Sequence, residues 1–252
     1  MADRATGKKW TRPEAMLAYR LYCEIPFGKM HHRNERVIQL ARLLGRTPGS
    51  VALRLVNFAH LDPALQARGI RGMSNVSSLD REVANAFATN WDSAVEATAK
   101  AWAAMEPSEP ADAIVEGPTE GVATAKVRLT QRFFRRAVLA AYDFSCCACQ
   151  IETRELLVAS HIIPWSVNSK ERTNPRNGLA FCALHDRAFD AGLLTVSPSY
   201  VLRISPELRR FQQLSLIRVG FLDLAGERIR LPSRFVPEQR FLRYHNRVVF
   251  KP

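Results

Sequence analysis

Three segments in the middle of the chain decide the fold: ELLVASHIIPW at residues 155–165, NPRNGLAF at 174–181 and LHDRAFDAGLL at 184–194. The first is an apolar, β-branched run that ends at His161, which predicts a strand. A polar loop leads from there to Asn177. The residues after Asn177 predict a short strand, a helix and a further strand. The order strand, loop, strand, helix predicts a ββα unit.

This set of motifs resembles the HNH endonucleases, whose core is a ββα-metal fold. The resemblance runs from Arg132 to Val196, and SHIIPW, NPRNGL and LHDRAFD are its most specific parts. It implies an α+β nuclease domain that hydrolyses phosphodiester bonds with a divalent metal ion.

Two residues of these motifs are the expected catalytic pair. We expect His161 to act as general base, because an imidazole with a pKa of about 6.5 accepts a proton from water at neutral pH. The alternative is a histidine satisfied within the core. The resemblance gives Asn177 the family's middle position, where its amide bridges backbone groups and holds His161 in place. The alternative for Asn177 is a simple turn before Gly178.

The predicted helix offers ligands for a catalytic ion. Asp186 and Asp190 are four residues apart and therefore share a face of the helix. By resemblance, the position of Asp186 supplies a metal ligand, and His185 is one place earlier. Carboxylates favour Mg²⁺ or Mn²⁺, so we expect one such ion on Asp186 or His185, with Asp190 as a further ligand or in a salt bridge. The family commonly has a ligand before its histidine, whereas this chain has Ser160.

The cysteines suggest a second metal. Cys146 and Cys149 are spaced as C-x₂-C, and Cys182 precedes His185 with the same spacing. Four such ligands suit tetrahedral structural zinc, and the alternative is a set of small buried hydrophobic residues. The N-terminus shows no secretory signal, so we expect reduced cysteines and a cytoplasmic protein.

Charge and composition indicate two basic domains. The 252 residues carry 36 Lys and Arg against 24 Asp and Glu, a formal net charge of +12. The composition excludes a disordered or collagen-like chain, and no apolar run approaches the roughly 18 residues of a membrane helix. Residues 106–125 contain no basic residue, and they predict an acidic, Pro-containing linker. The linker joins a helical domain at 1–105 to a nuclease domain at 126–252, which ends in a basic, β-containing extension. Basic domains of this kind indicate a polyanionic partner, and we expect double-stranded DNA.

The N-terminal domain contains a predicted helix-turn-helix. Asn34 is the expected N-cap of its first helix, Gly45 ends that helix, and Thr47 caps the second. The residues expected to contact DNA from this pair are Arg46, Ser50, Arg54 and Asn57. Four more arginines are expected to contact phosphates: Arg132, Arg135, Arg136 and Arg176.

The sequence thus predicts a metal-dependent endonuclease for double-stranded DNA, of the kind used in bacterial restriction or anti-phage defence. A homodimer would be needed if one site per chain is to cut both strands. Two alternatives remain open: a non-catalytic DNA-binding regulator with a degenerate HNH scaffold, and an RNase.

Overall fold

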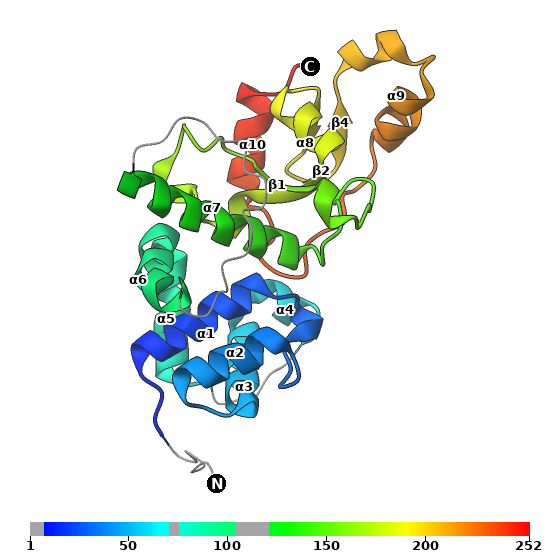
Figure 1. Cartoon of the computed structure of the whole chain (residues 1–252). Coiled ribbons are helices and arrows are strands. Elements are labelled where there is room, and N and C mark those ends of the chain that lie inside the picture. The colour runs from blue at the N-terminus through cyan, green and yellow to red at the C-terminus, as the bar shows by residue number, and fades with distance from the viewer. Residues whose placement is uncertain (1–7, 71–75, 104–120) are drawn as a thin grey trace. The chain divides into compact units, whose positions relative to one another are not determined.

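The structure is a computed structural model that describes residues 8–70, 76–103 and 121–252. The chain divides into two compact units, Met1–Arg136 and Ala137–Pro252 (Figure 1). The predicted linker lies outside the described residues from 106 to 120, and its last residues begin a helix.

The first unit is helical. Its helices are α1 (Arg12–Glu24), α2 (Glu35–Leu44), α3 (Pro48–Leu61), α4 (Pro63–Ala67), α5 (Ser78–Thr89), α6 (Trp91–Ala103) and the first part of α7 (Gly121–Ala141). Helix α1 is central, since it packs against α2, α3, α5 and α6 and is buried from Ala15 to Glu24. Tyr19 of α1 contacts the rings of Phe58 and Phe87, which join α3 and α5 to it. The prediction of a mostly helical N-terminal part is therefore confirmed.

The helix caps of the predicted pair lie where the sequence places them. The Asn34 side chain accepts a hydrogen bond from the backbone N–H of Arg36, and Gly45 ends α2 in the left-handed conformation at φ 62°. The Thr47 hydroxyl accepts from the N–H of Ser50 and starts α3. These contacts satisfy backbone groups that a helix end leaves without partners.

The second unit is mixed. It contains β1 (Leu157–His161), β2 (Gly178–Cys182), α8 (Ala183–Asp190), β3 (Leu194–Val196), β4 (Leu202–Ile204), α9 (Ser215–Gly220) and α10 (Gln239–Val248). Strands β1 and β2 are antiparallel, with His161 opposite Gly178, and α8 packs against both. Strands β3 and β4 form a second antiparallel pair. The α+β class and the ββα order are confirmed.

The C-terminal extension is more helical than its apolar runs suggest. Only β4 is a strand of the predicted β-containing tail, while α9 and α10 are helices. Helix α10 buries Phe241, Leu242 and His245, which recur at helical spacing and pack on the core. Val248 at its end is 62% exposed. The apolar run at 248–250 begins in the last turn of α10, so a short run of this kind does not distinguish a strand from the end of a helix.

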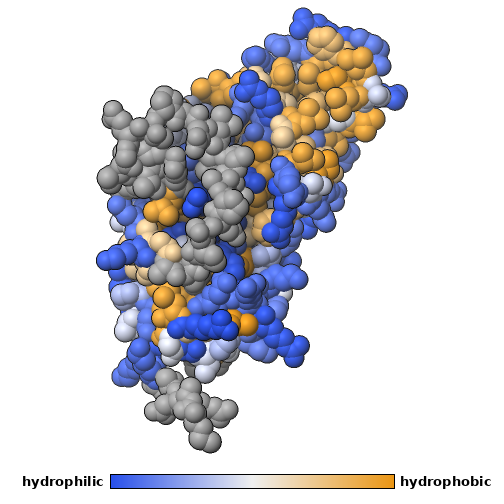
Figure 2. Space-filling model, in the orientation of Figure 1, coloured by the Kyte–Doolittle hydropathy of each residue, from blue (hydrophilic) through white to orange (hydrophobic). Residues whose placement is uncertain are grey.

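Hydrophobic surface gathers over the segment that carries α9 (Figure 2). Its exposed apolar side chains are Phe211, Leu214, Leu216 and Val219. In the described part of the chain, no helix is long and apolar enough to cross a membrane.

Candidate active site and metal cluster

His161 lies at the end of β1, where the chain leaves the hairpin and enters the long loop to β2. Its Nε2 lies 2.9 Å from the carbonyl oxygen of Arg172 in that loop. Because a carbonyl only accepts, Nε2 carries the proton, and the basic lone pair of the neutral ring is on Nδ1. The ring of Trp165 meets the imidazole edge-on, with centroids 5.5 Å apart. The loop thus encloses His161 and selects one tautomer.

Burial makes His161 a weaker base than an ordinary histidine. Desolvation lowers its pKa to about 4, and the hydrogen bond to Arg172 opposes that shift. The imidazole is therefore neutral at physiological pH, which is the form a general base needs.

Asn177 fastens the same loop from the other side. Its side chain is buried, its Oδ1 accepts from the N–H of Ile163 at 2.8 Å, and its Nδ2 donates to the carbonyl of Ile163 at 3.2 Å. A further bond from Nδ2 reaches the carbonyl of Glu171 at 3.3 Å. One amide therefore ties the residues after His161 to the residues before Arg172. This is the bridging geometry expected of Asn177; its contribution to catalysis stays a prediction.

Asp186 lies on the first turn of α8, and Ser160 of β1 faces it. The Ser160 hydroxyl donates to Oδ1 of Asp186 at 2.5 Å. The position where the family commonly has a ligand thus holds a group that orients the aspartate. Burial raises the pKa of Asp186, although the bond from Ser160 lowers it. Burial and then the nearby Asp186 raise the pKa of Asp190. A bound divalent cation would stabilise the charged form of both carboxylates, which burial disfavours.

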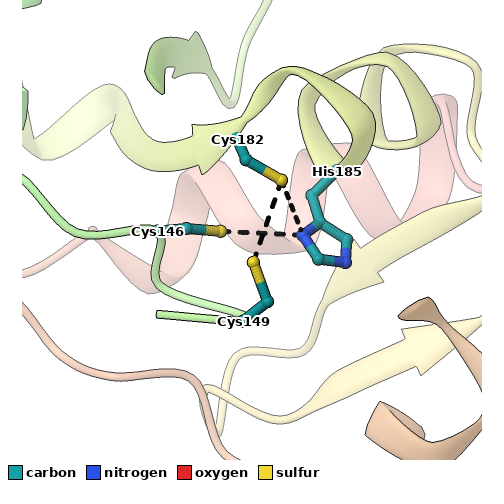
Figure 3. Close-up of side chains that lie close together, drawn as sticks. All are labelled: Cys146, Cys149, Cys182 and His185. Carbon is teal, nitrogen blue, oxygen red and sulfur yellow. Dashed lines mark hydrogen bonds between the residues drawn. The ribbon is translucent and has the colours of Figure 1, made fainter. Parts of the chain in front are cut away.

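A second cluster joins the two C-x₂-C/H motifs (Figure 3). The ligand atoms of Cys146, Cys149, Cys182 and His185 all lie within 4.8 Å of one another. The sulfurs of Cys149 and Cys182 are 3.8 Å apart, and Nδ1 of His185 is 3.6 Å from Cys146 and 3.2 Å from Cys182. Two thiolates of a tetrahedral zinc with Zn–S bonds of about 2.3 Å are separated by about 3.8 Å. The donor set and its spacing therefore fit zinc.

The backbone orients the histidine of this cluster. Nε2 of His185 donates to the carbonyl oxygen of Gly220 at 2.8 Å, so Nδ1 is the nitrogen that faces the sulfurs. Metal-binding histidines usually have such a second hydrogen bond, which fixes their tautomer. The structure groups His185 with the cysteines. Asp186 stays the expected ligand of the catalytic ion, because His185 lies with the cysteines.

Two of the residues expected to contact DNA from the helical pair, Arg46 and Arg54, form ion pairs within the first unit. The Arg46 side chain is 4% exposed, and its guanidinium pairs with Glu14 at 2.8 Å and lies 4.1 Å from the Trp10 ring centroid. Arg54 forms an ion pair with the fully buried Asp80, and its guanidinium lies 4.4 Å from the centroid of the same Trp10 ring. Both arginines hold the first unit together. The expectation that they point toward a groove is corrected, because the N-terminal residues and α5 cover them.

The other expected DNA contacts are all half-buried. Ser50 and Asn57 are half-buried on α3, and Arg132 and Arg135 are half-buried on α7. Arg136 is 27% exposed, and its guanidinium lies 3.6 Å from the buried Glu24. Arg176 is half-buried in the turn before β2, with its guanidinium 5.9 Å from the Phe235 ring.

The sequence gives no signal for groups that act through the backbone. The carbonyls of Arg172 and Gly220 set the tautomers of the two site histidines, and nothing in a residue's identity marks its carbonyl. Glu171 was also missed. Its carboxylate accepts from Asn174 and from Arg240 of α10, each at 2.7 Å, and so anchors the loop. No sequence signal pairs Glu171 with Arg240, which lies 69 residues later in the chain.

The comparisons with known proteins address this same segment. Residues 146–197 match a protein-family model described as HNH endonuclease. No curated protein matches the chain. The matched segment begins at the first cysteine of the cluster and contains His161, Asn177 and Asp186. The segment similar to HNH endonucleases therefore contains the ββα unit of β1, β2 and α8.

Proposed function

We propose that the protein is a metal-dependent endonuclease that hydrolyses phosphodiester bonds in double-stranded DNA. The observation that carries the proposal is the contact between His161 Nε2 and the Arg172 carbonyl. It fixes the tautomer, so that the neutral imidazole has its basic nitrogen at Nδ1, as proton abstraction from water requires.

The roles of the chain's residues follow from their contacts. His161 takes a proton from the attacking water at Nδ1, and Asn177 holds the loop so that the imidazole keeps its orientation. Asp186 and Asp190 would hold Mg²⁺ or Mn²⁺, with Ser160 orienting Asp186. Such an ion, when bound, polarises the phosphate and stabilises the departing oxygen.

The cysteine cluster has a separate, structural role in this proposal. Cys146, Cys149, Cys182 and His185 would hold one Zn²⁺, whose four ligands leave no open position for chemistry. The ion would join the segment before β1 to the start of α8. Binding of this ion would stabilise the folded ββα unit, because metal–ligand bonds contribute directly to the folding free energy.

The substrate and the biological role rest on charge and architecture. The net charge of +12 favours a polyanion, and a helical unit accompanies the nuclease domain. Ser50, Asn57, Arg132, Arg135, Arg136 and Arg176 are the proposed DNA contacts. We further propose that the protein acts in restriction or anti-phage defence in the cytoplasm. It would cut both strands as a homodimer.

The test is a substrate panel. Supercoiled plasmid, duplex, single-stranded DNA and RNA of one sequence would be incubated with Mg²⁺, with Mn²⁺ and with EDTA. We expect metal-dependent cleavage of the duplex substrates. Cleavage of RNA in preference to duplex would make the protein an RNase. Duplex binding without cleavage under either metal would support the alternative of a degenerate scaffold that only binds DNA.

A further inference from the structure

Helix α10 is held rigidly on the nuclease core by its inner face. The imidazole of His245 stacks on the Phe189 ring of α8, with centroids 3.6 Å apart and planes 10° apart. Its Nδ1 lies 2.8 Å from the Thr195 hydroxyl of β3, and Asn246 donates to the carbonyl of Val196 at 2.7 Å. The outer face of α10 therefore has a fixed position relative to α8 and β3.

That outer face carries arginines without acidic partners. Arg243 and Arg247 are exposed and four residues apart, so they lie on the same side of the helix. Arg203 of β4 joins them, because its Nη1 donates to Oδ1 of Asn246 at 3.3 Å and its guanidinium lies 5.0 Å from the Phe250 ring. Among the described residues, none of the three forms a salt bridge. We name Arg203, Arg243 and Arg247 the α10 arginine face.

A neighbouring arginine shows the contrast. Arg240, at the start of the same helix, pairs with Glu238 at 2.5 Å and with Glu171 at 2.7 Å. Glu171 in turn offers its backbone carbonyl to the amide of Asn177. Arg243 follows Arg240 by three residues and is its neighbour on the helix surface. The α10 arginine face therefore begins one helical turn from the ion pair that anchors the loop around His161.

Physical chemistry favours an anion on this face. Three like charges held on a rigid surface repel one another, and a polyanion relieves that repulsion. Guanidinium groups bind phosphate oxygens through a planar fork of donors, which suits them to a nucleic-acid backbone. Arginines that only contact water would be equally exposed. They would not require a helix that is fixed on the core and joined to the loop around His161.

We propose that the α10 arginine face binds the phosphate backbone of duplex DNA next to the active site. The inference rests on the proposed function, and it names the part of the nuclease domain that positions the substrate. Phosphate contacts of this kind set register and orientation without reading sequence. Replacing the arginines should therefore weaken binding to all duplexes alike.

The test is the salt dependence of duplex binding, measured in a His161→Ala background so that the DNA stays intact. Each phosphate contact contributes about 0.9 to the slope of log K against log salt concentration. The double variant Arg243→Gln/Arg247→Gln should lower the slope by about 1.8, and Arg203→Gln alone by about 0.9. The matched control is Arg209→Gln/Arg210→Gln, which removes the same charge from exposed positions of the same unit. It should leave the slope unchanged.

The outcomes separate the two claims. If the parent protein binds duplex DNA and the α10 variants keep its slope, the inference is overturned and the proposed function stands. An equal loss in the control would overturn it too, since net charge alone would then explain the effect. If the parent protein does not bind duplex DNA, the proposed function and the inference both fall. Thermal midpoints equal to the parent's show that each variant is folded.

Discussion

The imidazole of His161 donates from Nε2 to the carbonyl oxygen of Arg172, which lies 11 positions later in the chain. This contact decides which nitrogen can act as a base, and the amide of Asn177 fixes the loop that supplies the carbonyl. The arrangement links tautomer, burial and loop geometry in one place. The expected pH dependence of cleavage follows from it.

The pH dependence of cleavage should reflect a buried histidine. Burial lowers the pKa of His161 to about 4, so the base is neutral and competent at every pH above that value and is lost as pH falls through it. At saturating metal, we expect kcat/KM to keep its value from about pH 8 down to about pH 5. A pH profile in single-turnover cleavage measures this. An acid limb centred near 6.5 would show that His161 is solvated or is not the base.

The Mg²⁺ dependence of cleavage should change when Asp186, or the Ser160 that orients it, is replaced. Asp186→Asn removes the proposed ligand and should abolish cleavage at millimolar Mg²⁺. Ser160→Ala removes only the hydrogen bond to Asp186, so the Mg²⁺ concentration for half-maximal rate should rise by about 10-fold. Ser166→Ala, in the exposed part of the loop, is the matched control and should change nothing. A normal Mg²⁺ titration for Asp186→Asn would remove this residue from the metal site.

Zinc should be bound at one ion per chain and should stabilise the nuclease domain. We expect Cys182→Ser to lose the ion, because it removes one of four ligands. Elemental analysis and the thermal midpoint measure both effects. Cys147→Ala is the control, since Cys147 is a neighbour of Cys146 but lies outside the cluster. Wild-type protein purified without zinc and with an unchanged midpoint on adding it would refute the assignment.

Arg54 should matter for stability more than for DNA binding. Its partner Asp80 is fully buried, so Arg54→Met leaves a buried charge without its ion pair and should lower the free energy of unfolding by about 3 kcal/mol. The exposed Arg42 of α2 gives the comparison, and Arg42→Met should stay within about 0.5 kcal/mol of wild type. Urea denaturation of both variants checks the difference. Equal stability combined with lost duplex affinity for Arg54→Met would restore its role as a DNA contact.

Local patterns predicted the parts of the fold that depend on neighbouring residues. The apolar run ending at His161 gave β1, and Asn34 and Thr47 capped the helices that their positions predict. The motif spacing also grouped Cys146 with Cys149 and Cys182 with His185, because each pair is local. In each case the signal and the structure lie within a few residues of each other.

Partners that are distant in sequence were not predictable. Arg54 looked like a surface residue of a recognition helix, yet Asp80 lies on α5 and reaches it only through tertiary packing. The ion pair between Arg240 and Glu171, which are distant in sequence, could not be predicted for the same reason. A charged side chain carries no sign of whether an acid will be packed against it, and a backbone carbonyl carries no sign of which histidine it will accept from.

The most direct test of the account is single-turnover cleavage of supercoiled plasmid with Mg²⁺ by wild-type protein and by His161→Ala. His32→Ala, at an exposed histidine of the first unit, is the control. Loss of a general base costs about 10²-fold to 10⁴-fold in rate. The account predicts metal-dependent nicking by wild type and by the control, a rate at least about 100-fold lower for His161→Ala, and equal zinc content in all three. Equal rates for wild type and His161→Ala would contradict it.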